Sequence, residues 1–148
     1  MGKVEIYTDG ACSGNPGAGG WAAKLMFGAE FKEISGFDAE TTNNRMELLA
    51  AIRGLEALKR AGDVVELYSD SAYLVKAVQN GWIANWQRNG WKTADKSPVK
   101  NRDLWEQLIE LNEKFRPKYI KVKGHADNPH NNRCDELAVA EIRRNKSK

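Results

Sequence analysis

Cysteine, histidine and long apolar runs are all scarce in this chain of 148 residues. The two cysteines, Cys12 and Cys134, are too few and too far apart for the disulfide framework typical of small secreted proteins. The two histidines, His125 and His130, do not combine with them at zinc-finger spacing. We therefore interpret both cysteines as small packing residues and expect no zinc site.

The sequence also lacks a segment suited to membrane insertion or secretion. No run approaches the roughly 20 apolar residues that cross a bilayer, and a strand pattern beginning at Lys3 leaves no room for a signal peptide. With 41% apolar and 29% charged residues, the composition is typical of a globular protein and not of a disordered or fibrous one. We expect a soluble cytoplasmic protein with a single domain over residues 1–148.

Hydrophobic periodicity predicts alternating strands and helices. Strands are expected at residues 3–8, 21–27, 31–37, 64–68 and 119–123. Helices are expected through Leu48, Ile52, Leu55 and Leu58, and at residues 70–79, 104–115 and 131–144. The glycine-rich residues 14–20 indicate a turn, which makes the first three strands an antiparallel meander. The fold class is therefore α/β, with a five-stranded mixed sheet flanked by helices.

Carboxylates occur at the ends of these predicted elements. Asp9 closes the first strand, Asp70 follows the fourth, and Glu47 and Asp135 lie in the first turns of two helices. Strand ends and helix starts can converge at one edge of a sheet, where clustered like charges need a cation to offset them. Oxygen ligands without a Cys or His cluster favour Mg²⁺ or Mn²⁺, and two such ions can promote phosphodiester hydrolysis.

Each carboxylate also has a simple structural explanation. Asp70 could be a helix N-cap, and Asp135 a first-turn acid favoured by the helix dipole. Glu47 follows Asn44 at capping-box spacing, and Asp9 could be a turn residue. These explanations are adequate singly, but they leave the convergence of all four acids unexplained.

Five segments carry a more specific signal. They are YTDGACSGNPG at 7–17, TTNNRME at 41–47, SDS at 69–71, VKGHA at 122–126 and NRCDELA at 132–138. Together, and in this order, they resemble bacterial type 1 ribonuclease H over nearly the whole chain. The resemblance implies a ribonuclease H-like fold and hydrolysis of the RNA strand of RNA–DNA hybrids. The products would carry 5′-phosphate and 3′-hydroxyl ends.

The resemblance also implies a set of catalytic residues. Asp9, Glu47, Asp70 and Asp135 would hold two Mg²⁺ ions, with Mn²⁺ as a possible substitute. Asp9 would bridge both ions, Asp135 would complete the nucleophile side, and Glu47 and Asp70 the leaving-group side. His125 would supply a mobile imidazole that shuttles a proton or helps to release product. His130 matches no catalytic position, and we interpret it as a surface residue.

A basic and aromatic segment follows the second predicted helix. Its candidate nucleic-acid contacts are Trp82, Trp86, Arg88, Lys92, Lys96 and Lys100. By resemblance this segment is the basic arm that holds the DNA strand, while Thr42 and Asn101 hold a DNA phosphate. The alternative is a solvated hairpin whose tryptophans complete the core. Gln87 and Asn89 make the arm less basic than in some relatives, which predicts a lower affinity for the hybrid.

Selectivity for RNA requires groups near the 2′-hydroxyl. The family's minor-groove contacts match Asn15, Asn43 and Asn44, with the backbone at Gly10 and Cys12. The two adjacent asparagines could instead only cap a helix. Ala72 stands where some relatives have a longer polar residue, so the resemblance implies one contact fewer to the RNA strand. No element looks placed to enter a major groove, so cleavage should be largely independent of base sequence.

Other functions remain open from the sequence. A non-catalytic hybrid-binding module would keep the arm and the asparagines but lose a metal ligand. Another nuclease on the same fold, such as a transposase, integrase or resolvase domain, would lack this combination of motifs. A structural basic domain would leave the acids without a role. We expect an RNA–DNA hybrid as partner, a monomer, no obligate protein partner and no membrane association.

Overall fold

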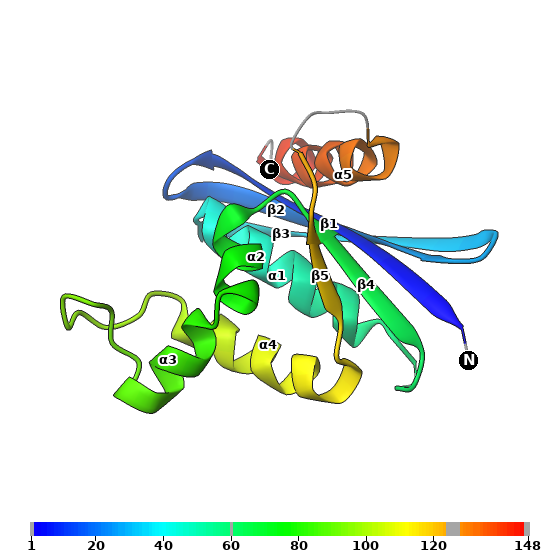
Figure 1. The fold of residues 1–148 in the computed structure, drawn as a ribbon. Helices are drawn as coiled ribbons and strands as arrows, with labels where there is room; N and C mark the ends of the chain where they lie inside the picture. The colour runs from blue at the N-terminus through cyan, green and yellow to red at the C-terminus, as the bar shows by residue number, and fades with distance from the viewer. Residues whose placement is uncertain (1, 60, 124–127, 147–148) are drawn as a thin grey trace.

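The computed structural model describes residues 2–59, 61–123 and 128–146 (Figure 1). The strands are β1 (Lys3–Gly14), β2 (Gly17–Phe27), β3 (Glu30–Thr41), β4 (Val64–Ser69) and β5 (Lys118–Lys121). The helices are α1 (Asn43–Glu56), α2 (Ala72–Gln79), α3 (Trp82–Asn89), α4 (Arg102–Phe115) and α5 (Pro129–Lys146). In the part of the chain described, no helix combines the length and apolar character needed to span a membrane.

The strands form one sheet in the order β3-β2-β1-β4-β5. Strands β1, β2 and β3 pair antiparallel, whereas β4 lies parallel to β1 and β5 parallel to β4. This arrangement confirms the predicted mixed sheet with an antiparallel first half. The parallel half follows from the helices between β3 and β4 and between β4 and β5, because parallel neighbours need a crossover connection.

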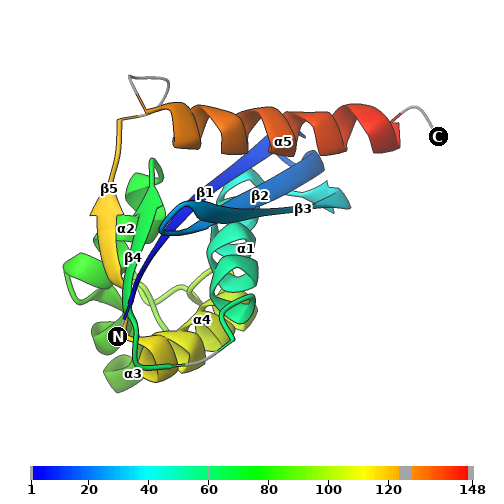
Figure 2. The same ribbon diagram turned by 90° about the vertical axis from the view of Figure 1, so that its right-hand side faces the viewer.

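Helices cover the two faces of the sheet unequally (Figure 2). The larger core lies on the α1 side, where Ile6 of β1, Leu67 of β4 and Trp105 of α4 are fully buried. On the opposite face α5 is the helix that packs against the sheet in the described part of the chain, and its Cys134 and Ala138 contact Tyr7 and Ala22. Cys134 is a buried packing residue, as predicted, and Cys12 is half-buried with a free thiol.

The structure corrects the predicted ends of several elements. Strand β1 runs to Gly14, so Asp9 lies inside the strand and not at its end. Only residues 15 and 16 form the turn, and Gly17, Gly19 and Gly20 belong to β2. A Cβ atom on Gly20 would lie 2.1 Å from the carbonyl oxygen of Ala138. This glycine is needed for the close approach of α5, and turn geometry is not its role.

Candidate active site

Asp9 lies where the sheet opens beside β1. The parallel pairing of β1 with β4 ends at Tyr7 and Tyr68, and β4 itself ends at Ser69. Beyond that point β1 still pairs with β2, through Asp9 opposite Ala22, but none of the described strands pairs with its other side. The side chain of Asp9 is nevertheless only 4% exposed, because helices approach from both faces.

Gly10 explains how α1 comes close enough to take part. A Cβ atom at this position would lie 2.6 Å from the backbone nitrogen of Glu47 and from the carbonyl carbon of Met46. Any larger residue would therefore push the first turns of α1 away from β1. With glycine here, the Glu47 side chain, 5% exposed, is held next to Asp9.

The simple structural explanations of the four acids are wrong. The N-cap of α2 is Ser71, whose side chain accepts a hydrogen bond from the Leu74 nitrogen at 3.2 Å, so Asp70 is not the cap. The N-cap of α1 is Thr42 and not Asn44. Helix α5 has no acid in its first turn, and Asp135 lies beyond it. None of the acids is therefore required to begin or to cap an element.

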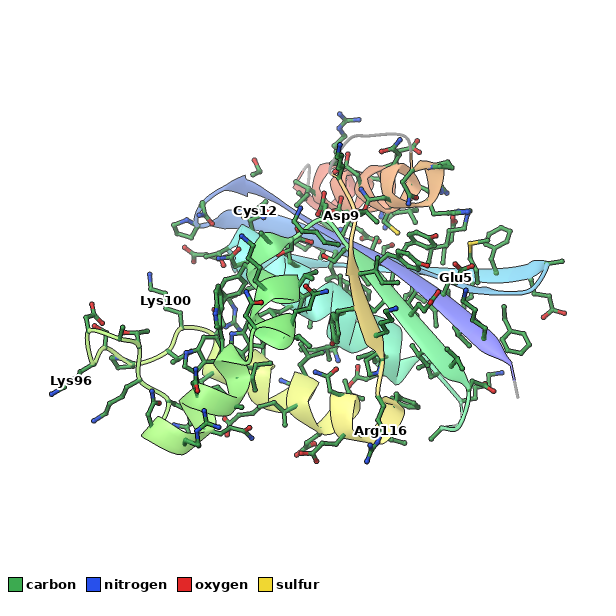
Figure 3. The ribbon with its side chains drawn as sticks, viewed as in Figure 1. Glu5, Asp9, Cys12, Lys96, Lys100 and Arg116 are labelled. Carbon is green, nitrogen blue, oxygen red and sulfur yellow. The ribbon has the colours of Figure 1, made fainter. Side chains whose placement is uncertain are left out.

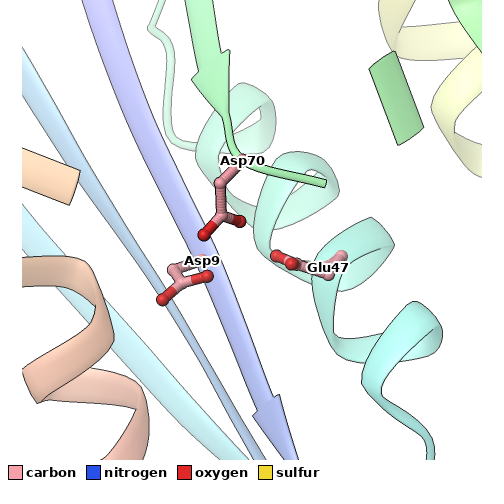
Figure 4. Close-up of side chains that lie close together, drawn as sticks. All are labelled: Asp9, Glu47 and Asp70. Atoms are coloured by element: carbon pink, nitrogen blue, oxygen red, sulfur yellow. The ribbon is translucent and has the colours of Figure 1, made fainter. Parts of the chain in front are cut away.

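The carboxylates of Asp9, Glu47 and Asp70 point toward one another (Figure 4). One oxygen of each lies within 4.8 Å of one oxygen of the others, a spacing at which a metal ion could bind all three. Asp135 approaches the same group from α5 on the opposite face of the sheet, close enough that its charge raises the pKa of Asp9. The four acids predicted from the sequence are thus brought together.

Burial and mutual repulsion change the protonation of this cluster. Burial raises the pKa of Asp9 to about 8, and the charges of Asp70 and Asp135 act in the same direction. Burial also raises the pKa of Glu47 well above its ordinary value, and the charges of Asp9 and Asp70 add to the effect. A hydrogen bond from the Gly10 backbone opposes both increases. Without a cation, the buried pair therefore tends to hold protons.

The donor set fits a hard divalent cation. Oε1 of Glu47 is buried, and within the described ranges it has no hydrogen-bond partner. A buried carboxylate oxygen without a partner is unfavourable, and a metal ion would satisfy it. All the ligand atoms are carboxylate oxygens, which suit Mg²⁺ or Mn²⁺ better than Zn²⁺.

The predicted RNA contacts gather at the start of α1. The side-chain oxygen of Asn15 accepts a hydrogen bond from the backbone nitrogen of Asn43 at 3.2 Å, which joins the β1–β2 turn to the helix. Asn15, Asn43 and Asn44 are all exposed. Since Thr42 caps the helix, the two adjacent asparagines are not the cap and their side chains face solvent.

The basic arm, residues 82–100, comprises α3 and the loop after it. Figure 3 shows Lys96 and Lys100 on this loop, which projects away from the sheet and from Asp9. Arg88 and Lys92 are also exposed. The tryptophans divide between the two interpretations: Trp82 is 38% exposed, whereas Trp86 is half-buried with its ring centroid 5.4 Å from that of Trp105 in the core.

Two residues make contacts that the sequence did not indicate. The side chain of Asn89 accepts a hydrogen bond from the Lys92 nitrogen at 3.1 Å and donates one to the Lys92 oxygen at 3.0 Å. Asn89 therefore links α3 to the loop that follows it, and the lower affinity expected from its lack of charge stays a prediction. His130 is partly exposed and packs against Tyr7, with 4.9 Å between the ring centroids. The proposed catalytic His125 lies outside the described residues.

Known proteins resemble this chain in sequence and in fold. The family model described as RNase H matches residues 1–143. Ribonuclease H of Chlorobaculum parvum is 62% identical over 140 residues, which cover 95% of this chain and 95% of the relative. The crystal structure of LC9-RNase H1, a type 1 RNase H, has a TM-score of 0.85 at 26% identity and covers 96% of this chain and 72% of that one.

One related structure contains nucleic acid. LC11-RNase H1, solved in complex with an RNA/DNA hybrid, has a TM-score of 0.74 at 25% identity. The similarity covers 95% of this chain and 97% of that one. The matches in sequence and in structure extend over nearly all of the elements that build the acidic cluster. The chain therefore belongs to the ribonuclease H family.

Proposed function

We propose that this protein is an endoribonuclease that hydrolyses the RNA strand of RNA–DNA hybrids. The observation that carries the proposal is the convergence of Asp9, Glu47 and Asp70, with one oxygen of each within 4.8 Å of the others, and with Asp135 close enough to raise the pKa of Asp9. None of these acids has a capping role to explain it. Family membership and the hybrid complex of LC11-RNase H1 support the same activity.

The acidic cluster would hold two Mg²⁺ ions, with Mn²⁺ as a substitute. When bound, the metal activates water and stabilises the leaving oxygen of the phosphodiester. The chain holds these carboxylates in place. Asp9 lies within β1, and the close approach of α1 at Gly10 places Glu47 beside it. Ser71 caps α2, so the Asp70 carboxylate is not used for capping. His125 is proposed to move a proton at the cleavage site.

The hybrid would be held on both strands. Asn15, Asn43 and Asn44, with the backbone at Gly10 and Cys12, would contact the RNA strand near its 2′-hydroxyls. Thr42 and Asn101 would bind a DNA phosphate, and the basic arm would follow the DNA backbone through Arg88, Lys92, Lys96 and Lys100. Trp82 is exposed enough to face the deoxyribose side, with Trp86 beneath it.

We further propose that residues 1–148 form one catalytic domain that acts as a cytoplasmic monomer without an obligate protein partner. A non-catalytic hybrid-binding module is the main alternative. Oε1 of Glu47, which is buried and has no hydrogen-bond partner among the residues that the structure describes, favours the enzyme, because a binding module gains nothing from it while the folded state loses stability.

A single RNA strand, labelled at one end, tests the proposal in three forms: single-stranded, paired with RNA and paired with DNA. Each form is incubated with Mg²⁺ or with EDTA. We expect cleavage of the RNA–DNA hybrid alone, and only with Mg²⁺. Binding without cleavage would instead support the non-catalytic module, and cleavage of all three forms would contradict the asparagine-based selectivity.

A further inference from the structure

Asn101 has an unusual conformation for a residue that begins a helix. It is the N-cap of α4, but its side chain makes no capping hydrogen bond. Its backbone is left-handed, with φ 65°, a conformation that asparagine tolerates better than most residues but that is still unfavourable. Such strain persists where other contacts compensate for it and is frequent at functional sites. The amide of Asn101 is therefore held for a purpose other than capping.

Arg45 of α1 holds the oxygen end of this amide. Its Nη1 atom donates to Oδ1 of Asn101 at 3.2 Å and to Oδ1 of Asp103 at 3.0 Å. Its Nη2 atom donates to Oδ2 of Asp103 at 2.8 Å. The paired contact with Asp103 fixes the plane of the guanidinium and neutralises its charge. Arg45 is thus placed to orient a neighbour and is poorly placed to bind an anion itself.

Tyr73 of α2 holds the nitrogen end. Its hydroxyl oxygen accepts hydrogen bonds from Nδ2 of Asn101 at 3.1 Å and from Nε1 of Trp105 at 3.0 Å. Trp105 is completely buried, so this contact anchors the amide to the core. A primary amide carries two N–H groups, and Tyr73 takes only one of them. The second N–H of Asn101 is left for another acceptor.

Arg45 also contacts Thr42, through its backbone. The Arg45 nitrogen donates to Oγ1 of Thr42 at 3.2 Å, which directs the Thr42 hydroxyl proton elsewhere. Arg45 therefore donates to the side-chain oxygens of both Thr42 and Asn101, and the hydroxyl proton of Thr42 and the second N–H of Asn101 remain as donors. Two donors presented beside the N-terminus of a 14-residue helix suit a phosphate.

We infer that Arg45 and Tyr73 are positioning residues, which orient Thr42 and Asn101 so that their donors face one phosphate of the DNA strand. This inference rests on the proposed function and deepens it. Neither residue contacts the reacting atoms in this arrangement. Their effect should appear in hybrid affinity and KM, with kcat at saturating hybrid nearly unchanged.

A double-mutant cycle tests the inference. Arg45→Lys keeps the positive charge and the backbone N–H but cannot contact Asn101 and Asp103 together. We expect Arg45→Lys and Asn101→Ala each to raise the Kd for the hybrid about tenfold and the double variant to be no weaker than either one, since both remove the same contact. Arg53→Lys, which alters the exposed pair with Glu56 at the other end of α1, is the matched control.

Two further measurements separate positioning from other roles. The dependence of Kd on salt should not change in Arg45→Lys, because the charge that meets the phosphate is not that of Arg45. Tyr73→Phe should weaken binding by a few-fold alone and not at all in the Asn101→Ala background, and it carries the test if an Arg45 variant fails to fold. Two results would overturn the inference. One is a Kd for the hybrid in Arg45→Lys equal to that of the unsubstituted protein. The other is a Kd in the double variant raised by the product of the two single effects. If the parent itself does not cleave the hybrid, the proposed function has failed instead.

Discussion

The acidic cluster and the basic arm are built in opposite ways. Asp9 and Glu47 are almost completely buried, and each is fixed by a long strand or helix. The basic arm holds its charges on exposed side chains of a short helix and a loop. Its backbone bends through left-handed residues such as Trp91, with φ 64°, and Lys96, with φ 68°. One region is rigid and desolvated, and the other is solvated and open.

The difference follows from the range of the forces involved. Metal ligation and phosphodiester chemistry require positions accurate to a fraction of an ångström, which only well-packed elements provide. Attraction between lysines and phosphates acts over several ångströms and tolerates small movements. Substitutions in the acidic cluster should therefore alter kcat, and substitutions in the basic arm should alter affinity.

Asp9→Asn should produce the largest effect. The amide has the same shape but carries no charge, so hybrid cleavage with Mg²⁺ should fall by roughly a thousandfold or more, while hybrid binding persists or improves. Single-turnover cleavage and fluorescence anisotropy measure the two quantities. Asp38→Asn, on an exposed part of β3, is the control and should leave both unchanged. Substantial Mg²⁺-dependent turnover in Asp9→Asn would disprove the metal assignment.

Neutralising the basic arm should give the reverse result. Replacing Lys92, Lys96 and Lys100 with Ala should weaken hybrid binding about tenfold or more and reduce the slope of log Kd against log salt by about 1 for each lost phosphate contact. The value of kcat should change little. Replacing Lys76, Lys114 and Lys118 removes the same charge elsewhere and should leave the slope alone. Equal slopes in the two triple variants would mean that the lysines of the basic arm are solvated and do not contact the phosphates.

The acidic cluster should also make stability depend on pH when metal is removed. Folding raises the pKa of Asp9 from 3.8 to about 8. The stabilising contribution of the protonated form is then fully present below about pH 4 and is lost as the pH rises through about 8. In EDTA, the Tm of the parent should therefore fall relative to that of Asp9→Asn between about pH 5 and pH 9.

Mg²⁺ should offset this loss of Tm at high pH, because the metal binds the ionised carboxylates. The rise in Tm on adding Mg²⁺ should grow with pH over the same interval and should be small in Asp9→Asn. The triple-lysine variant of the basic arm should behave as the parent does. A Tm difference between parent and Asp9→Asn that does not vary with pH would show that Asp9 is already ionised in the metal-free fold.

The sheet and most helices were predictable because their signals are local. Alternation around Ile6 and the helical spacing of Leu48, Ile52 and Leu55 each reflect burial on one face, and all four residues are fully buried. The four acids were identified for a different reason, since their motifs resemble those of a known family. Residue spacing alone left open a capping role for Asp70, which the structure removes.

Features set by distant contacts were not predictable. Several residues in a row could cap α1 or α2, and packing decides in favour of Thr42 and Ser71. The glycines after Pro16 look like a turn, whereas they belong to β2, and Gly20 among them gives α5 room to approach. Arg45 and Asn101 are 56 positions apart, so no local pattern could indicate their hydrogen bond. Sequence thus predicted the clustered acids better than the contacts between distant residues.

Asn89 offers the finest test of how the two regions differ. Its side chain makes two hydrogen bonds with the backbone of Lys92, so Asn89→Ala should release the loop without changing any charge. We expect a loss of about 1 kcal/mol in unfolding free energy and a two- to threefold rise, approximately, in the Kd for the hybrid. The salt slope should stay as in the parent, since the lysines remain. Gln87→Ala, at an exposed position of the same helix, is the matched control for lost amide. If Asn89→Ala binds the hybrid as tightly as Gln87→Ala does, the conformation of the loop does not contribute to affinity. The basic arm would then bind the hybrid through its charges alone.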